Sequence, residues 1–152
     1  MSESARTGPE RRTDTLAKLE AVGADAWVAT ASPTGAAYLV PLSYAWDGQC
    51  IVLAAIVTSP TVRNIRASGH ARLGFGPTRD VVIVDAELDV ILDVSEAPEE
   101  LAIAYARQSG WDPRGEPEPY AYALLHLRHV QAWREANELA GRRLMRDGEW
   151  LV

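Results

Sequence analysis

Hydrophobic and polar residues alternate along the middle of the chain with the two-residue period of β-strands. Three strand-like runs cover Asp25 to Ala31, Ala36 to Trp46 and Gln49 to Thr58. The turn-forming segments Ser32-Pro33-Thr34-Gly35 and Asp47-Gly48 separate them. Because turns this short join strands that run in opposite directions, the pattern predicts an antiparallel meander.

The third of these runs is hydrophobic at every position from Ile51 to Val57. A strand with one solvated face would alternate, so both faces of this strand are expected to be covered. We expect a barrel interior on one face and a partner or ligand on the other.

The second half of the chain predicts a long hairpin, a further strand and a closing hairpin. Ala71 to Phe75 and Val81 to Val94 flank a turn that contains glycine and proline, and Tyr120 to Trp133 forms another run. Arg142 to Met145 and Trp150 to Val152 predict the last hairpin. In the run from Val81 to Val94, the residues expected to be buried on one face are Val82, Val84, Ala86, Leu88 and Val90.

Three segments show the period or the end signals of helices. Hydrophobic residues recur at helical spacing from Thr13 to about Val22. Ser59 is a suitable N-cap for a short helix from Pro60 to Ser68, and Ala97 to about Ser109 predicts a further helix. The segment from Trp111 to Pro119 is rich in proline and glycine, which indicates a rigid and irregular loop.

The size and composition of the chain fit one globular domain. The chain has 152 residues, of which 47% are hydrophobic and 24% are charged. Residues 1–12 lack hydrophobic periodicity and are expected to form a flexible tail, so the domain covers residues 13–152. The single cysteine, Cys50, excludes an intramolecular disulfide. Without a segment typical of a membrane span or a signal sequence, the expected location is the cytoplasm.

Charge is distributed unevenly along the chain. The formal net charge of −6 argues against general binding to nucleic acid or to an anionic membrane, since both favour a broad basic surface. Between Gly48 and Arg79, however, there is no Asp or Glu. Arg63, Arg66 and Arg72 also lie in this stretch, which indicates a local site for a small anionic ligand.

The start of the helix at Ser59 is the best candidate for such a site. Its free backbone N–H groups, the hydroxyls of Thr58, Ser59 and Thr61, and the guanidinium of Arg63 would converge on a phosphate. The alternative is an ordinary capped helix with surface arginines, and the local sequence leaves both interpretations open.

Other polar residues favour structural roles. Asp85, Glu87 and Asp89 share one face of a strand and predict a solvated surface rather than paired catalytic carboxylates. His126 and His129 are three residues apart and should point to opposite faces of a strand. No metal site is therefore predicted.

The cysteine and two tryptophans allow limited predictions. Cys50 has no basic neighbour in sequence, which predicts a structural thiol rather than a reactive one. Trp111 and Trp133 lie near Arg114 and Arg134, which would suit stacking on a flat ligand. Packing in the core or at a dimer interface is the alternative for both. No side chain takes the role of a general acid or base, so no catalytic residue is assigned.

The order of these elements and several segments resemble the pyridoxamine 5′-phosphate oxidase-like family of FMN- or F420-binding split β-barrels. The segments are Ala37-Tyr38-Leu39-Val40-Pro41-Leu42-Ser43-Tyr44, Trp46-Asp47-Gly48, and Ser59-Pro60-Thr61-Val62-Arg63-Asn64-Ile65 with the following Ala71-Arg72-Leu73. The similarity extends from about Thr13 to the end of the chain. It implies a mainly β, α+β fold, namely a six-stranded antiparallel split β-barrel with short helices that forms a homodimer.

The resemblance also implies that FMN, or alternatively the deazaflavin F420, binds in a groove at the dimer interface. Residues 40–42 and 55–56 would face the flavin ring, and the helix start at Ser59 together with Arg63 would hold the phosphate. The tryptophans would reach across the interface. The full set of expected cofactor-binding residues is Val40, Pro41, Leu42, Ala55, Ile56, Thr58, Ser59, Thr61, Arg63, Asn64, Arg79, Val81, Trp111 and Trp133.

The resembling family implies a flavin- or deazaflavin-dependent oxidoreductase that transfers a hydride to or from a small substrate. Many members carry Lys or Arg one or two positions after the serine, where this chain has Pro60 and Thr61. This difference would weaken cofactor binding roughly tenfold or more unless Arg63, Arg66 or Arg79 supplies the charge. Oxidation of pyridoxamine phosphate itself is not expected, because the C-terminal segment lacks a matching arginine and histidine pattern. The alternatives are a cofactor- or haem-binding carrier without turnover and a structural dimer with a vestigial site.

Overall fold

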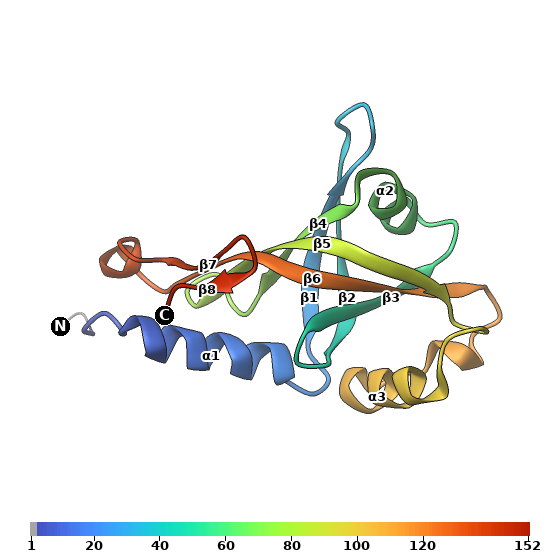
Figure 1. Ribbon diagram of the computed structural model, residues 1–152, viewed down its shortest axis with the longest axis horizontal. Coiled ribbons are helices and arrows are strands. Elements are labelled where there is room, and N and C mark those ends of the chain that lie inside the picture. The colour runs from blue at the N-terminus through green and yellow to red at the C-terminus, as the bar shows by residue number, and fades with distance from the viewer. Residues whose placement is uncertain (1–2) are drawn as a thin grey trace.

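A closed antiparallel barrel forms the centre of the molecule (Figure 1). The computed structural model describes residues 3–152. The strands follow the order β3-β2-β1-β4-β5-β6 around the barrel, and pairing of β3 with β6 closes it. The barrel strands are β1 (Asp25–Ala31), β2 (Ala37–Trp46), β3 (Cys50–Ile56), β4 (His70–Phe75), β5 (Val81–Asp93) and β6 (Tyr120–Trp133). The predicted meander and the predicted six-stranded barrel are both confirmed.

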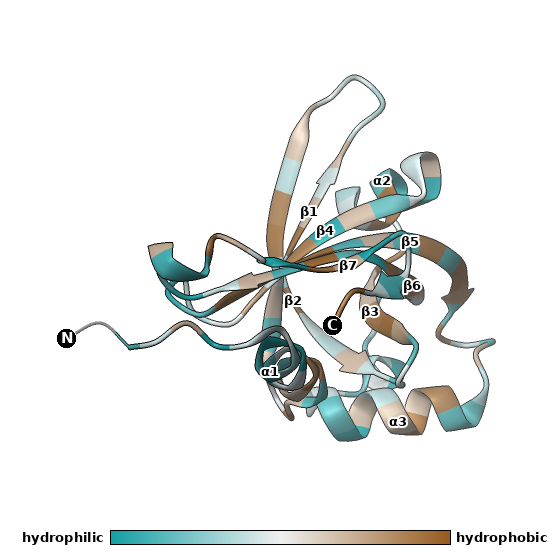
Figure 2. Ribbon diagram, turned by 60° about the vertical axis from the view of Figure 1, so that its left-hand side comes forward, coloured by the Kyte–Doolittle hydropathy of each residue, from teal (hydrophilic) through white to brown (hydrophobic). Residues whose placement is uncertain are grey.

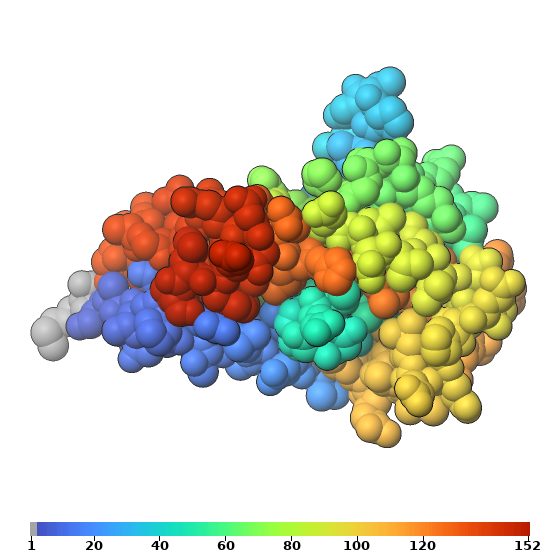
Figure 3. All heavy atoms as spheres, in the orientation of Figure 1, coloured from blue at the N-terminus to red at the C-terminus, as the bar shows by residue number. Residues whose placement is uncertain are grey.

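Helices and a short hairpin surround the barrel. They are α1 (Gly8–Glu20), α2 (Pro60–Ser68), α3 (Glu99–Ser109), β7 (Arg143–Arg146) and β8 (Glu149–Trp150). In Figure 1, α1 lies beneath β7 and β8, α3 lies beneath the other end of the barrel, and α2 lies on the upper side. The turn between β1 and β2 projects from the body of the molecule (Figure 3). None of the helices within residues 3–152 has both the length and the hydropathy needed to cross a bilayer.

Strand β3 is buried on both faces, as its unbroken hydrophobic run predicts. Ile51 and Leu53 belong to the barrel core, whereas Val52 and Ala54 belong to a second cluster with Tyr105 of α3. Figure 2 shows hydrophobic residues on β3 and on part of α3. The prediction of a partner or ligand over the outer face is therefore wrong for most of β3, because α3 of the same chain covers it.

The barrel core connects the strands to α1 and α2. The rings of Tyr44 and Phe75 meet edge to face, with centroids 4.9 Å apart. The Tyr44 hydroxyl donates a hydrogen bond to the Lys18 carbonyl oxygen at 2.6 Å, so this phenol has a partner in α1. Leu19 of α1 and Ile65 of α2 are buried in the same cluster. Removing either side chain would leave a cavity in the core.

The first helix begins at Gly8, within the segment predicted to be a flexible tail. Thr7 accepts a hydrogen bond from the Glu10 backbone N–H, and the Glu10 carboxylate accepts one from the Thr7 N–H. This reciprocal capping box stabilises the helix start. The prediction of a flexible tail is therefore wrong for residues 8–12. Residues 1 and 2 of the predicted tail lie outside the described part of the chain.

Two β-bulges in the pairing of β5 with β6 change which side chains face outward. The shift between Leu88 and Val90 leaves Val90 36% exposed, so its predicted burial is wrong. The other shift leaves Arg128 without a partner in the ladder. Because this extra residue breaks the alternation, His129 and His126 both reach carboxylates on the outer surface, and their predicted placement on opposite faces is wrong.

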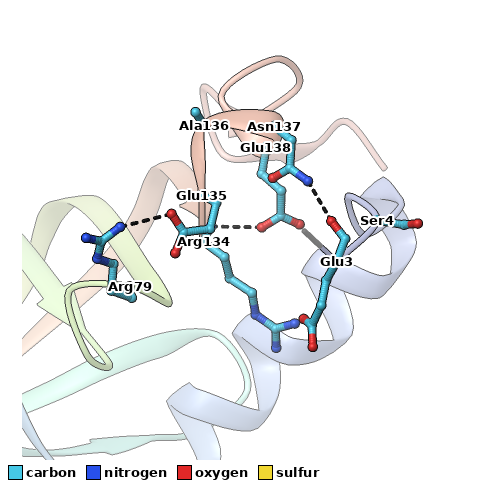
Figure 4. A pocket seen from close by; sticks show the side chains of 8 residues that line it. All are labelled: Glu3, Ser4, Arg79, Arg134, Glu135, Ala136, Asn137 and Glu138. Carbon is cyan, nitrogen blue, oxygen red and sulfur yellow. Dashed lines mark hydrogen bonds and ion pairs between the residues drawn. The ribbon is translucent and has the colours of Figure 1, made fainter. Parts of the chain in front are cut away.

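A buried carboxylate joins the N-terminal segment to the end of β6. The Glu138 side chain, 3% exposed, accepts hydrogen bonds from the backbone N–H and the guanidinium of Arg6 and from the backbone N–H of Arg134. The Arg11 guanidinium donates to the Glu138 carbonyl oxygen at 2.9 Å. Figure 4 shows Glu138 beside Arg134 and Glu3. Hydrogen bonding to Arg6 lowers the pKa of Glu138 from its ordinary value of 4.5 to about 2.

This pKa makes a testable contribution to stability. The depressed pKa stabilises the folded chain above pH 4.5, and this stabilisation is lost as the pH falls toward 2. We predict that Glu138→Gln lowers the free energy of unfolding by about 3 kcal/mol at pH 7, with the difference from the wild type shrinking as the pH falls. Urea unfolding at several pH values measures this difference. The exposed carboxylate variant Glu135→Gln is the control, and a pH-independent difference for Glu138→Gln would contradict the account.

Candidate functional site

A groove of about 480 Å³ lies where the end of β3 meets the start of α2. Strand β2 and the segment from Trp111 to Tyr120 contribute its other walls. The lining residues are Asp25, Tyr38, Val40, Pro41, Leu42, Ser43, Ala54, Ala55, Ile56, Ser59, Thr61, Trp111 and Tyr120. More than half of the residues predicted to bind a cofactor are therefore brought together in one groove.

The groove combines an aliphatic surface with an aromatic wall. Val40, Leu42 and Ile56 are partly exposed along it. The rings of Trp111 and Tyr120 meet edge to face with centroids 5.1 Å apart. The Trp111 indole N–H donates to the Glu116 carboxylate at 2.8 Å, which fixes the position of the ring. A surface of this kind suits a flat ring system with a polar extension.

The start of α2 offers fewer free donors than the sequence predicts. Pro60 has no N–H group, and the Val62 N–H donates to the Ser59 hydroxyl at 3.3 Å. The Arg63 N–H donates to the Ser59 carbonyl oxygen at 3.1 Å. Among the described residues, the Thr61 N–H is the first-turn donor without a partner. The expectation of several free N–H groups is therefore wrong, because the cap that starts the helix uses them.

The positive charge near the groove comes from exposed arginines of α2. Arg63 and Arg66 form no ion pair within the described part of the chain. Arg72, in contrast, pairs with Asp85 at 2.6 Å. The unpaired positive charges of residues 48–79 therefore lie on α2, and the first turn of this helix borders the groove.

Three predicted residues of the α2 segment, Thr58, Arg63 and Asn64, lie outside the lining of the groove. Arg63 is exposed on the helix, so its contact with a cofactor stays a prediction. Thr58 is exposed just before the helix. Asn64 is buried, and its amide donates to the Thr30 hydroxyl at 3.1 Å, which holds α2 against β1. A contact between Asn64 and a cofactor stays a prediction, and the observed contact is structural.

Arg79, Val81 and Trp133 lie at a different place in the barrel. Val81 pairs with Trp133 in the ladder of β5 with β6. Arg79 lines a separate hollow and pairs with Glu135 at 2.9 Å (Figure 4). None of the three lines the groove of this chain. Their part in cofactor binding stays a prediction that depends on how a second copy would be placed.

Sequence reasoning missed several lining residues, namely Asp25, Tyr38, Ser43, Ala54 and Tyr120. The Ser43 hydroxyl donates to Asp25 at 3.1 Å because β1 and β2 place these residues opposite each other. Tyr120 pairs with Ile56 across the closure of the barrel. Tyr38 and Ser43 could have been found, since they flank the hydrophobic segment already assigned to the groove.

No protein-family profile and no curated protein sequence matches this chain. Solved structures do match. An F420 reductase is 14% identical with a TM-score of 0.61, covering 75% of this chain and 94% of its own. A Listeria innocua protein described as a candidate pyridoxamine 5′-phosphate oxidase is 11% identical with a TM-score of 0.61, covering 81% and 98%.

A protein described as haem-binding shares the same architecture. A haem-binding protein from Mycobacterium smegmatis is 15% identical with a TM-score of 0.63, and the match covers 94% of this chain and 59% of that protein. At such identities the likeness concerns the fold alone. The chain thus has the split β-barrel fold of pyridoxamine 5′-phosphate oxidase-like proteins.

Proposed function

We propose that the protein is a flavin-dependent oxidoreductase that binds FMN, or alternatively F420, in the groove between β2, β3 and α2. The observation that carries this proposal is the juxtaposition of a hydrophobic surface with the start of a helix that bears unpaired arginines. The two structural matches described as F420 reductase and as candidate pyridoxamine 5′-phosphate oxidase support it. When bound, the cofactor would supply the hydride chemistry with a small substrate.

The residues of the groove can hold the two ends of such a cofactor differently. Val40, Leu42 and Ile56 offer a hydrophobic surface that keeps water from one face of a flat ring. The hydroxyls of Ser59 and Thr61, with the Thr61 N–H, offer donors to a phosphate. We propose that Arg63 supplies the cationic contact, because Pro60 and Thr61 occupy the positions where related proteins carry a basic residue.

The lining favours a flavin over haem. None of the described residues that line the groove is His, Cys or Met, the commonest ligands of haem iron. Tyr38 and Tyr120 are the remaining candidates. Burial raises the pKa of Tyr120, which disfavours the phenolate that would bind iron. A haem carrier is therefore the second candidate, supported by the fold of the haem-binding match rather than by the groove.

We further propose that the protein forms a homodimer through the outer face of β1 and β2. Trp27 is 55% exposed and lies opposite Pro41, and Leu39 is 59% exposed and lies opposite Ala29. These residues form a continuous hydrophobic ladder on one face of the hairpin. Exposed hydrophobic ladders typically mark protein interfaces, and this one adjoins the groove through Pro41.

Cofactor titration tests the proposed function directly. We predict that FMN or F420 binds with one site per chain and that Arg63→Ala weakens binding about tenfold or more, because one charge-assisted contact is lost. Fluorescence of the flavin and of the protein's tryptophans follows the titration. Arg72→Ala removes a paired arginine from the same acid-free stretch and serves as the control.

The outcomes separate the candidate functions. Reduction of the bound cofactor by NADPH and its reoxidation by a quinone support an oxidoreductase, whereas tight binding without reduction by any donor supports a carrier. Equal affinity in the wild type and in Arg63→Ala would contradict the phosphate assignment. Binding of haem with neither flavin bound would replace the proposed function by the second candidate.

The dimer makes a separate prediction. Replacing Leu39 by Glu places a charge in the hydrophobic ladder, so we expect Leu39→Glu to shift the protein from dimer to monomer without unfolding it. Analytical ultracentrifugation measures the mass. Ile103→Glu on α3 changes a residue that is 42% exposed outside the ladder and should leave the dimer intact. A dimer that tolerates Leu39→Glu would exclude this face as the interface.

A further inference from the structure

Three metal-ligating side chains meet on the outer surface of the barrel, far from the groove. Cys50 of β3, His126 of β6 and Asp89 of β5 come from three adjacent strands. The Cys50 Sγ lies 3.3 Å from His126 Nδ1, and His126 Nε2 lies 3.6 Å from Asp89 Oδ1. One ligand atom from each residue lies within 4.8 Å of the other two.

The pairing of the strands explains why these residues meet. Cys50 and His126 are directly opposite each other in the ladder that closes the barrel, so their side chains share a face. The β-bulge between Leu88 and Val90 leaves Asp89 without a partner in the ladder. Its side chain is therefore free to turn along the surface toward His126.

We propose that Cys50, Asp89 and His126 form a binding site for a divalent transition metal ion, with zinc as the ion that this ligand set suits best. Thiolate, imidazole and carboxylate are the three ligand types that proteins use for zinc. Three protein ligands leave a fourth position of a tetrahedral site for water or an external ligand.

The spacing of Cys50 and His126 suits such an ion. Tetrahedral zinc places a sulfur and a nitrogen ligand about 3.5 Å apart, and the observed separation between Cys50 Sγ and His126 Nδ1 is 3.3 Å. Asp89 faces the other ring nitrogen, so its carboxylate must swing to join the ion. The side chains of His126 and Asp89 are 49% and 50% exposed, which leaves them room for this movement.

The same three residue types also occur in nucleophilic thiol sites, but this environment opposes that role. Cys50 is 4% exposed, and burial raises the pKa of its thiol to about 11. A protonated and buried thiol is a poor nucleophile.

The site is separate from the proposed cofactor groove. Cys50 begins β3 and Ile56 ends it, so the two lie roughly 20 Å apart along the strand at about 3.3 Å per residue. A metal ion at Cys50 would link β3, β6 and β5 where the barrel closes. We therefore expect metal binding to stabilise the fold independently of any cofactor.

Metal titration of untagged, reduced protein tests the proposal. Zinc affinity is measured by competition with a chromophoric chelator, and cobalt reports a thiolate ligand through its near-ultraviolet charge-transfer band. We expect one ion per chain and a cobalt charge-transfer band that Cys50→Ser abolishes. We also expect the zinc affinity of His126→Gln to be at least about 100-fold lower than that of the wild type. Losing a residue that only hydrogen-bonds to a metal ligand costs roughly 10–100-fold in affinity, and losing the ligand itself should cost more.

Two further variants, His129→Gln and Asp89→Asn, test the metal site even if Cys50→Ser fails to fold. His129→Gln removes a histidine of the same strand that also faces a carboxylate but lacks a cysteine, and it should bind zinc like the wild type. Asp89→Asn changes a half-exposed residue and should weaken binding. Zinc affinity that is unchanged in His126→Gln, or cobalt binding without the thiolate band, would overturn the proposal.

Discussion

The pairing of β3 with β6 is the constraint on which the rest of the structure depends. It runs from Cys50 opposite His126 to Ile56 opposite Tyr120, and it turns an open sheet into a barrel. One end of this ladder forms a wall of the groove, and the other end gathers the proposed metal ligands. Because β3 is buried on both faces, opening this seam would expose two hydrophobic clusters at once.

The start of α2 shows a balance between stability and binding. Ser59 and Pro60 are well suited to begin the helix. However, the Val62 N–H donates to the Ser59 side chain and is not free to bind an anion, and Pro60 has no N–H group. A phosphate at this place would therefore depend more on side chains than on the helix terminus. The acid-free stretch of sequence fits that arrangement, since it leaves Arg63 without a competing carboxylate among the described residues.

The sequence predicted the features that local patterns determine. Alternation and turn residues defined the strands, and the unbroken run from Ile51 to Val57 predicted a doubly buried strand. The early start of α1 was missed because Thr7 and Glu10 form a capping box without hydrophobic periodicity beside it. The two bulges and the buried Glu138 were missed because they depend on partners distant in sequence, such as Arg6, 132 residues away.

The candidate site shows the same division. The hydrophobic groove residues and the helix start lie in segments that sequence patterns identify, and the structure brings them together. Trp133 was assigned from its neighbouring arginine as well as through resemblance, and Arg79 as a substitute charge. The closed barrel places both outside this chain's groove. The cluster of Cys50, Asp89 and His126 could not be read from spacing, because it requires the register of three strands and a bulge.

Amide hydrogen exchange with and without FMN tests the central claim most directly, because it locates the cofactor without altering the chain. The account predicts slower exchange in residues 38–43, 54–61 and 111–120, which contain the groove lining. Exchange that slows only around residues 79–81 and 133–138, at the separate hollow, would contradict it.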